Sequence, residues 1–343
     1  MKPLTVLATG MITGVGLDSP SSCAAMRCAI DAFGETRFMD RGGEWIIGSA
    51  VPLDPPLRGR EKIVRMALAA IGECLSGLQD MAPGAVPILL CVAENDRPGR
   101  FQGLDQTLLD DVSRQLGVPL HPASAIFSNG RVAGVQAIVR ARELIDSGIP
   151  CCVLAGVDTF LVAATLADFE AKRRLLTSKN SDGFIPGEAG AAVLLGPGKE
   201  QPERQLLCLG VGFAMEKATV DSGEPLRADG LAEAILAAIA DSNCGYERLD
   251  YRLSDANGEQ YRFKEAALAR ARTIRILKCV HELWHVADCI GEIGAAVVPC
   301  AIAVARAAAV KGYAPGKGVL CHFGNDGRER AAMILRYSRH GGG

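Results

Sequence analysis

Apolar and polar positions follow two patterns along this chain, and together they predict a mixed α/β protein. Apolar residues recur every three to four positions from Ile63 to Leu78, which predicts a long amphipathic helix. The run at 86–93 is apolar on both faces, as in a strand buried within a sheet that helices cover. Further strands are expected at 4–8, 151–155, 189–195, 206–214 and 251–254, and further helices at 21–32, 133–146, 230–240 and 294–310.

The order of these elements starts again after a polar, proline-bearing segment at 197–205. A strand, a helix and a strand precede that segment at 4–8, 63–78 and 86–93, and the same order follows it at 206–214, 230–240 and 251–254. The sequence shows no clear repeat, but the recurrence of the order indicates a duplicated α/β unit. We therefore divide the chain into an N-terminal half, 1–199, and a C-terminal half, 200–343.

Composition and charge exclude several functions. The 37 basic and 39 acidic residues leave a formal net charge of −2, with no basic excess to neutralise nucleic-acid phosphates. The longest apolar stretch, 294–310, contains Pro299 and Arg306 and is too short to span a bilayer, and the start of the chain lacks the apolar region of a signal peptide. The twelve cysteines lie mostly in apolar runs, without CxxC pairs or histidines at metal-ligand spacing. We expect no nucleic-acid, membrane or metal binding, and buried thiols in a reducing cytoplasm.

A glycine-rich segment, TGMITGVG at 9–16, matches the phosphate-binding pattern of short-chain dehydrogenases. Those enzymes also need a tyrosine and a lysine four positions apart on a helix. The instance here, Tyr313 to Lys317, contains a proline and a glycine that make a turn instead. A turn packed closely against neighbouring backbone is the better interpretation, so we expect neither NAD nor another cofactor.

Five segments, in order, resemble those of the β-ketoacyl synthases, the condensing enzymes of the thiolase fold. The opening, VLATGMITGVGLDSPSSCAAMRCAIDAFGETRF, resembles their first strand, glycine-rich turn and helix, and SDGFIPGEAGAAVLL is the most specific match. The other three are GVQAIVRARELIDSG with CCVLAGVD, then CIGEIGAAVVPCAIAVARAA, then CHFGNDGRERAAMIL. The resemblance covers nearly the whole chain. It implies a five-layer αβαβα fold made of two related halves, in agreement with the repeated order of elements.

The resemblance also implies where a catalytic site would lie, and the catalytic side chains are absent there. A condensing synthase needs a cysteine thiolate and two imidazoles. The matching positions hold Arg131 in place of the cysteine, Asn257 in place of the first histidine and Glu292 in place of the second. A guanidinium cannot act as a nucleophile, so we expect Arg131 and Glu292 to form a buried ion pair.

No catalytic residue is therefore expected, and the ligand-binding candidates are Ser128, Arg131, Asn257 and Glu292. Ser128 is a second possible nucleophile, although no histidine base stands in the matching segments. His285 and Cys289 lie near Glu292 in the sequence but do not restore the motif.

Three functions remain open on this basis. The absence of all three side chains favours a catalytically inactive protein that acts as partner subunit, chaperone or adaptor, in a fatty-acid or polyketide system or in bacterial protein secretion. The alternatives are an acyl-thioester-binding protein or acyltransferase of the 3-oxoacyl-ACP synthase type with a rebuilt site, and a condensing enzyme whose motifs lie elsewhere. The partner would be a synthase, a carrier protein or a secretion component.

The resemblance further implies a homodimer in which the strand at 151–155 pairs with its symmetry mate. That strand has no charge and no proline, so as an exposed edge it would be prone to aggregation.

Overall fold

The computed structural model describes residues 2–78, 82–198, 204–276, 278 and 281–338. Ten strands form one mixed sheet in the order β10-β9-β11-β12-β8-β1-β7-β6-β4-β5. Five of them come from the N-terminal half: β1 (Leu4–Ile12), β4 (Ile88–Cys91), β5 (Ala125–Phe127), β6 (Cys152–Thr159) and β7 (Glu188–Pro197). Five come from the C-terminal half: β8 (Gln205–Met215), β9 (Tyr251–Ser254), β10 (Leu283–His285), β11 (Gly318–Gly324) and β12 (Glu329–Ser338).

The two halves of this sheet have the same topology. In each half the third strand in sequence is outermost, followed by the second, fourth, fifth and first. The two first strands, β1 and β8, meet antiparallel in the middle through three residue pairs, Leu4 to Val6 against Leu206 to Cys208. The structure confirms the two related halves.

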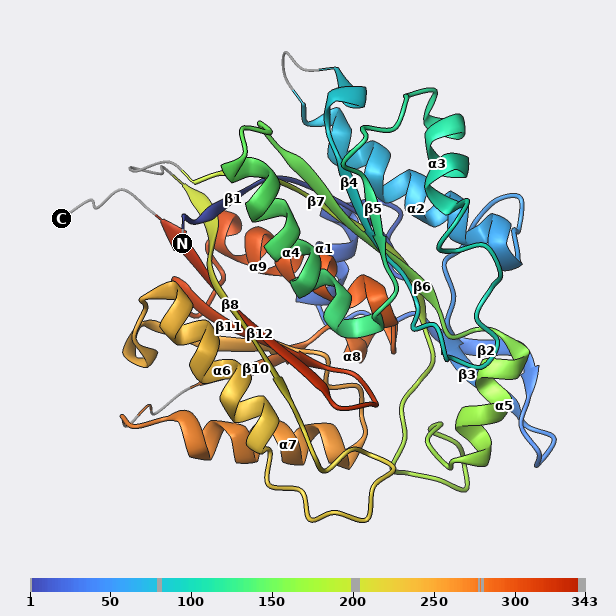
Figure 1. Ribbon diagram of the computed structural model, residues 1–343. Coiled ribbons are helices and arrows are strands. Elements are labelled where there is room, and N and C mark those ends of the chain that lie inside the picture. Colours follow the sequence, from blue (N-terminus) through green and yellow to red (C-terminus); the bar gives the residue numbers. More distant parts are fainter. Residues whose placement is uncertain (1, 79–81, 199–203, 277, 279–280, 339–343) are drawn as a thin grey trace.

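Helices complete five layers (Figure 1). On one outer face, α2 (Gly59–Ser76) packs on β1, β6 and β7, and α3 (Leu108–Leu116) packs on α2. On the other outer face, α6 (Asp229–Ser242) packs on β8, β11 and β12, and α7 (Gln260–Thr273) packs on α6. Between the two halves of the sheet lie α4 (Gly130–Asp146) and α9 (Val297–Lys311), which contact strands of both halves. This is the αβαβα arrangement that the resemblance to the β-ketoacyl synthases implies.

The central layer depends on a close helix crossing. A Cβ atom on Gly134 of α4 would lie 2.4 Å from the Cβ of Val298 on α9, so only glycine allows the two helices to approach this closely. Gly294–Lys311 is the one candidate membrane span among the described residues by length and apolarity. In this fold 72% of that segment is buried, as expected of a core helix.

The remaining elements are shorter and surround this core. A hairpin of β2 (Phe33–Met39) and β3 (Trp45–Ser49) lies beside α5 (Ala163–Ala171), as Figure 1 shows at the lower right. The others are α1 (Ser19–Arg27), α8 (Ala287–Ile290) and the 3₁₀ turns η1 (Pro83–Ala85), η2 (Tyr246–Arg248) and η3 (Gly294–Ala296).

Most expected elements are present, with changes at their ends. The helix expected at 21–32 is α1, which ends at Arg27 because the chain then turns into β2. The helix expected at 294–310 begins with the turn η3 before α9. Strand β1 continues through Gly10, where a Cβ would lie 2.0 Å from the carbonyl oxygen of Ala70 on α2. Because Gly10 has no side chain, α2 can pack closely against the strand.

One prediction about the sheet is wrong. The strand expected at 151–155 is not an edge, because β6 is hydrogen-bonded to β4 on one side and to β7 on the other. Its residues from Cys152 to Asp158 are all buried. Residues 151–155 carry no charge because both faces of the strand are buried, and the strand is not an exposed edge prone to aggregation. The edge of the N-terminal half is β5, which pairs only with β4 among the described strands.

The proposed boundary between the halves falls at the end of β7 and the start of β8, at Pro197 and Gln205. The division at 199 and 200 itself lies outside the described residues and stays a prediction. Apart from Cys28, the cysteines in the described part of the chain are buried, as small apolar residues would be.

Candidate functional site

Three of the four candidate residues come from segments far apart in the sequence and meet at one point in the central layer. Arg131 lies in the first turn of α4, Asn257 follows β9, and Glu292 lies between α8 and η3. The backbone N–H of Glu292 donates to the carbonyl of Ile185 over 2.8 Å, and the N–H of Gly187 donates to the carbonyl of Glu292 over 2.9 Å. These bonds hold the Glu292 loop against the segment SDGFIPGEAG.

Arg131 and Glu292 form the expected ion pair. The side chains are 1% and 3% exposed. Arg131 Nε donates to both carboxylate oxygens over 3.1 Å, and Nη2 donates to Oε2 over 2.9 Å. Glu292 also accepts from Asn257 Nδ2 over 2.7 Å and from the backbone N–H of Gly294 over 2.9 Å. The other side of the guanidinium donates from Nη1 to Asp326 Oδ1 over 2.9 Å.

The ion pair is part of a larger network that sequence reasoning missed. Asp326 also accepts from Arg174 over 2.7 and 3.1 Å and from Arg262 over 2.7 Å. Arg174 in turn donates to both oxygens of Glu259, over 2.6 and 2.8 Å. Asn257 Nδ2 lies 3.3 Å from Glu259, which closes the circuit back to the ion pair. Arg131 and Arg174 thus alternate with Glu292, Asp326 and Glu259, while Arg262 contacts Asp326 alone among these carboxylates.

No local signal in the sequence marks the added members of the network. Arg174 lies 85 residues from Glu259 and 152 residues from Asp326, and Arg131 lies 195 residues from Asp326. Only the fold brings them together. Glu259 is the exception, because it stands two residues after the candidate Asn257.

The network sets the ionisation of its members. Burial alone would lower the pKa of the Arg131 guanidinium, but the charges of Glu292 and Asp326 raise it well above its ordinary value. Burial alone would raise the pKa of Glu292, yet the charge and hydrogen bonds of Arg131 lower it. Asp326 has its pKa lowered well below the usual range, because three arginine charges outweigh its burial. All three groups are therefore charged at neutral pH.

A second ion pair lies beside the first. Arg97 donates to both oxygens of Asp158, over 2.8 and 2.9 Å, and also contacts Glu94. Asp158 accepts from the backbone N–H of Ala295 over 2.9 Å. Burial raises the pKa of Asp158 above its ordinary value in spite of the nearby arginine. Gly130, at the start of α4, has φ +53°, a backbone conformation that favours glycine.

The remaining candidates lie outside the network. Ser128 contacts the Asp105 carboxylate and accepts from Arg100 Nη2 over 3.2 Å, with no imidazole beside it in the described contacts. His285 and Cys289 line a different pocket, between α1, β10 and α9. Burial raises the pKa of the Cys289 thiol to about 11, so this thiol is not activated.

A cavity of about 510 Å³ opens over the network. We call it the Asn325 cavity. Its lining residues come from 94–98, 128–131, 168–172, 219–221 and 325–329, together with Phe160. Ser128 and Arg131 line it, but none of its lining residues is a cysteine or a histidine. Within the described part of the chain, no group of three or more His, Cys, Asp or Glu side chains could hold a metal ion.

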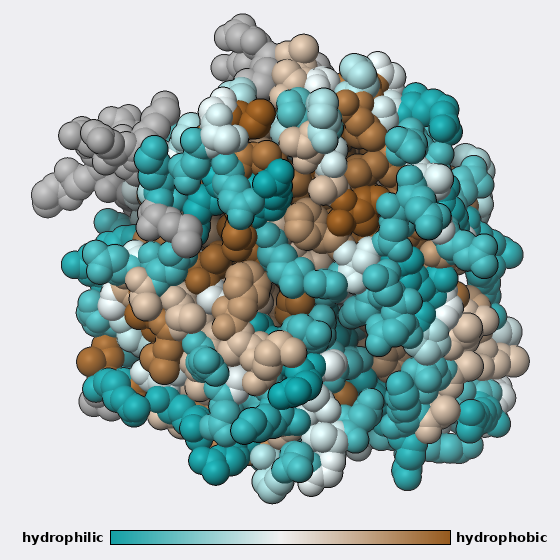
Figure 2. Space-filling model, in the orientation of Figure 1, coloured by the Kyte–Doolittle hydropathy of each residue, from teal (hydrophilic) through white to brown (hydrophobic). Residues whose placement is uncertain are grey.

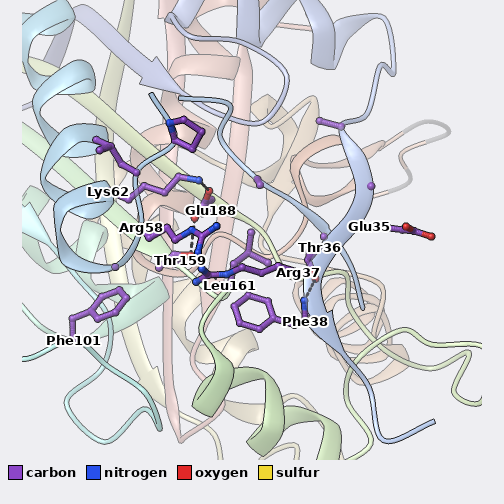
Figure 3. A pocket seen from close by; sticks show the side chains of 17 residues that line it. Glu35, Thr36, Arg37, Phe38, Arg58, Lys62, Phe101, Thr159, Leu161 and Glu188 are labelled. Carbon is purple, nitrogen blue, oxygen red and sulfur yellow. Dashed lines mark hydrogen bonds and ion pairs between the residues drawn. The ribbon is translucent and has the colours of Figure 1, made fainter. Parts of the chain in front are cut away.

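A separate pocket of about 360 Å³ lies between the β2–β3 hairpin and the start of α2 (Figure 3). Figure 3 shows Lys62 pointing at the buried Glu188, with which it forms an ion pair. Arg37 and Arg58 line the same pocket, and neither has a carboxylate within 4.0 Å in the described part of the chain. This pocket contains none of the candidate residues and shares no lining residue with the Asn325 cavity.

The fold is that of the ketosynthases of the thiolase type. A type II polyketide ketosynthase, AntDE, solved in complex with its acyl-carrier protein AntF, superposes with a TM-score of 0.80 over 98% of this chain and 100% of the other, at 14% identity. The ishigamide ketosynthase/chain length factor superposes with a TM-score of 0.74 over 99% and 100% of the two chains, at 16% identity.

The ketosynthase ApeO in complex with its chain length factor ApeC, from Xenorhabdus doucetiae, gives a TM-score of 0.73 over 98% of each chain, at 14% identity. No protein-family model matches this sequence, and no curated protein matches it. At identities this low, the superpositions show the common fold alone.

Replacing Arg131 by alanine should destabilise the protein by about 3 kcal/mol, because Glu292 then stays buried without its counter-charge. Arg140→Ala is the matched control, since Arg140 lies on the same helix but forms a half-exposed pair with Glu143. The control should change the free energy of unfolding by less than about 0.5 kcal/mol. Urea unfolding of both variants tests this, and equal losses would contradict the role of the buried pair.

The contribution of Asp326 to the free energy of unfolding should decrease in acid. Its pKa in the folded protein lies below the ordinary 3.8, so its stabilising effect is complete above pH 3.8 and is lost as the pH falls through the folded-state value. Asp326→Asn should therefore cost about 2 kcal/mol at neutral pH. The difference from the wild type should shrink only below pH 3.8. Urea unfolding over a pH series measures it, with Glu143→Gln as the exposed control, and a difference that stays constant into acid would contradict the assignment.

Proposed function

We propose that this chain is a catalytically inactive, ketosynthase-like subunit that acts by binding a protein partner. The observation that carries the proposal is the ion-pair network at the start of α4. Arg131 occupies the position that the resemblance implies for the nucleophile, and every side of its guanidinium is engaged by Glu292 or Asp326. A guanidinium held in this way cannot attack a thioester.

The chemistry of the pair opposes condensation as well. Decarboxylation of a malonyl group develops negative charge on an enolate, which needs hydrogen-bond donors or positive charge nearby. Glu292, with its lowered pKa, is an anion at neutral pH and would repel that charge. Asn257 could donate a hydrogen bond as an imidazole does, but its Nδ2 already donates to Glu292.

The solved structures that share the fold support a partner role in a polyketide or fatty-acid system. Two of them are pairs of a ketosynthase with a chain length factor, and one is a ketosynthase with its acyl-carrier protein. We infer that the partner of this chain is of the same kinds, a synthase or a carrier protein. None of these structures points to protein secretion. Buried thiols such as those of Cys208 and Cys300 support the reducing cytoplasm as its compartment.

A homodimer is a separate proposal, and the surface that we propose for it is the edge strand β5. On its open side the backbone groups of Ala125, Ile126 and Phe127 have no strand to pair with in the described chain. Figure 2 shows apolar side chains gathered beside this edge, towards α3. Leu116, at the end of α3, and Leu120 are only partly buried. An edge of this kind is stabilised by a second strand, and we propose that a second copy of this chain supplies it.

The purified protein should take up no acyl group from an acyl-thioester and release no carbon dioxide from malonyl-thioester. Intact-protein mass spectrometry after incubation measures the first, and a carbon dioxide assay the second. Arg131→Cys should remain inactive, because the donors for the oxyanion are still missing. An acyl adduct on any side chain would contradict the proposal. Located on Ser128, it would instead favour the acyltransferase alternative.

The protein should sediment as a dimer at micromolar concentration, and the β5 amides should exchange hydrogen more slowly in the dimer than after dilution. The physical reason is that outward-facing amides of β5 gain hydrogen-bond partners only across the interface. The amides of β10, at the opposite edge of the sheet, are the internal control and should not change. A monomer at micromolar concentration contradicts the homodimer, and an equal response of β10 contradicts the choice of edge.

A further inference from the structure

The Asn325 cavity carries an excess of negative charge. Six carboxylates and three cationic groups line it. Each cation is already matched within the lining: Arg97 contacts Glu94, Lys172 lies 2.9 Å from Asp168, and Arg131 lies 2.9 Å from Asp326. The cavity therefore has no free positive charge to offer a ligand.

The other three carboxylates have no such match. Asp96, Asp221 and Glu329 all line the cavity, and within the described part of the chain none has a basic group within 4.0 Å. They come from three separate segments, after β4, after β8 and at the start of β12. Negative charges that line one hollow reinforce each other, because the low-dielectric walls focus their field.

A buried acceptor in the same lining also lacks a partner. Asn325 is 6% exposed, and its Nδ2 donates to the backbone carbonyl of Asn129 over 3.0 Å. Its Oδ1 is buried without a hydrogen-bond donor in the described protein. Leaving such an oxygen unsatisfied is costly, so its presence in a cavity wall indicates a ligand that donates.

We propose that the Asn325 cavity binds a small aliphatic amine in its ammonium form. An ammonium group has three donors and one positive charge, which match the free oxygen of Asn325 and the unpaired carboxylates Asp221 and Glu329. Phe160 and Phe169 supply apolar wall for the methylene chain. The amine is either a free molecule or the side chain of a lysine in a peptide. This inference does not depend on the proposed function, because it concerns binding and not acyl transfer.

The same charges exclude the anions that a condensing enzyme handles. The charged side chains of this cavity that lack a counter-charge are all negative. The carboxylate of a malonyl group would therefore be repelled and would have no unpaired cation to bind. The structure therefore assigns this cavity a ligand of opposite charge to that of a condensation substrate.

Isothermal titration of the full chain with 1,5-diaminopentane at physiological salt tests the proposal, with malonate as the anionic comparison. We expect saturable, one-site binding of the diamine, a higher melting temperature in its presence, and no binding of malonate. The double variant Asp221→Asn, Glu329→Gln should bind the diamine roughly tenfold more weakly, as expected for the loss of one exposed and one partly buried charge contact. A short peptide with one lysine, in the same assay, distinguishes a protein source from a free amine.

Glu224→Gln is the matched control, since Glu224 is an exposed carboxylate close in sequence to Asp221 that does not line the cavity. It should bind the diamine as the wild type does. The absence of diamine binding, an equal loss in the control variant, or tighter binding of malonate would each overturn the proposal. Melting temperatures measured without ligand show whether the variants are folded. Because no thioester is present, the result is separate from the test of acyl transfer.

Discussion

The structure depends on the neutralisation of one buried arginine. Arg131 is 1% exposed and stands in the first turn of α4, where the helix dipole already places partial positive charge. A guanidinium there is stable only with carboxylates in direct contact. Glu292 and Asp326 supply them from the loops before η3 and after β11, and Arg174 and Glu259 extend the circuit. The balance of charge thus holds loops of both halves against the central helix.

Close backbone contacts hold the ketosynthase-like scaffold together around this centre. A Cβ on Gly156 would lie 2.3 Å from the carbonyl oxygen of Ala295, and one on Gly187 would lie 2.1 Å from that of Ile290. Together with the approach of Gly134 to α9, these contacts define how the loops and the central helices meet. They require small residues but no catalytic group. The fold can therefore persist while the side chains at its centre carry a different charge pattern.

The charge pattern connects the interior with the cavity above it. Both arginines that line the Asn325 cavity, Arg97 and Arg131, are neutralised by carboxylates in direct contact, Asp158 and Asp326. The lining is left with unpaired acids and an unsatisfied amide oxygen on Asn325. The buried ion-pair network and the acidic cavity are thus two results of the same placement of charges. The open edge strand β5 ends next to this cavity, because Ser128 and Asn129 follow β5 directly and line it.

The sequence by itself determined the elements, the repeated order of the two halves and the pairing of Arg131 with Glu292. The elements and their repeated order follow from periodicity. The pairing of Arg131 with Glu292 follows from the resemblance to the β-ketoacyl synthases, which places both residues at one site, and from the rule that a buried arginine needs a carboxylate. Only the tertiary structure decided that β6 lies inside the sheet and β5 at its edge, because an apolar strand looks the same in both places until its neighbours are known. It also decided that Asp326 and Arg174 complete the charge network, since residues 152 positions apart leave no local trace of their contact. Local pattern sets secondary structure, whereas strand order and long-range charge pairing are set by packing.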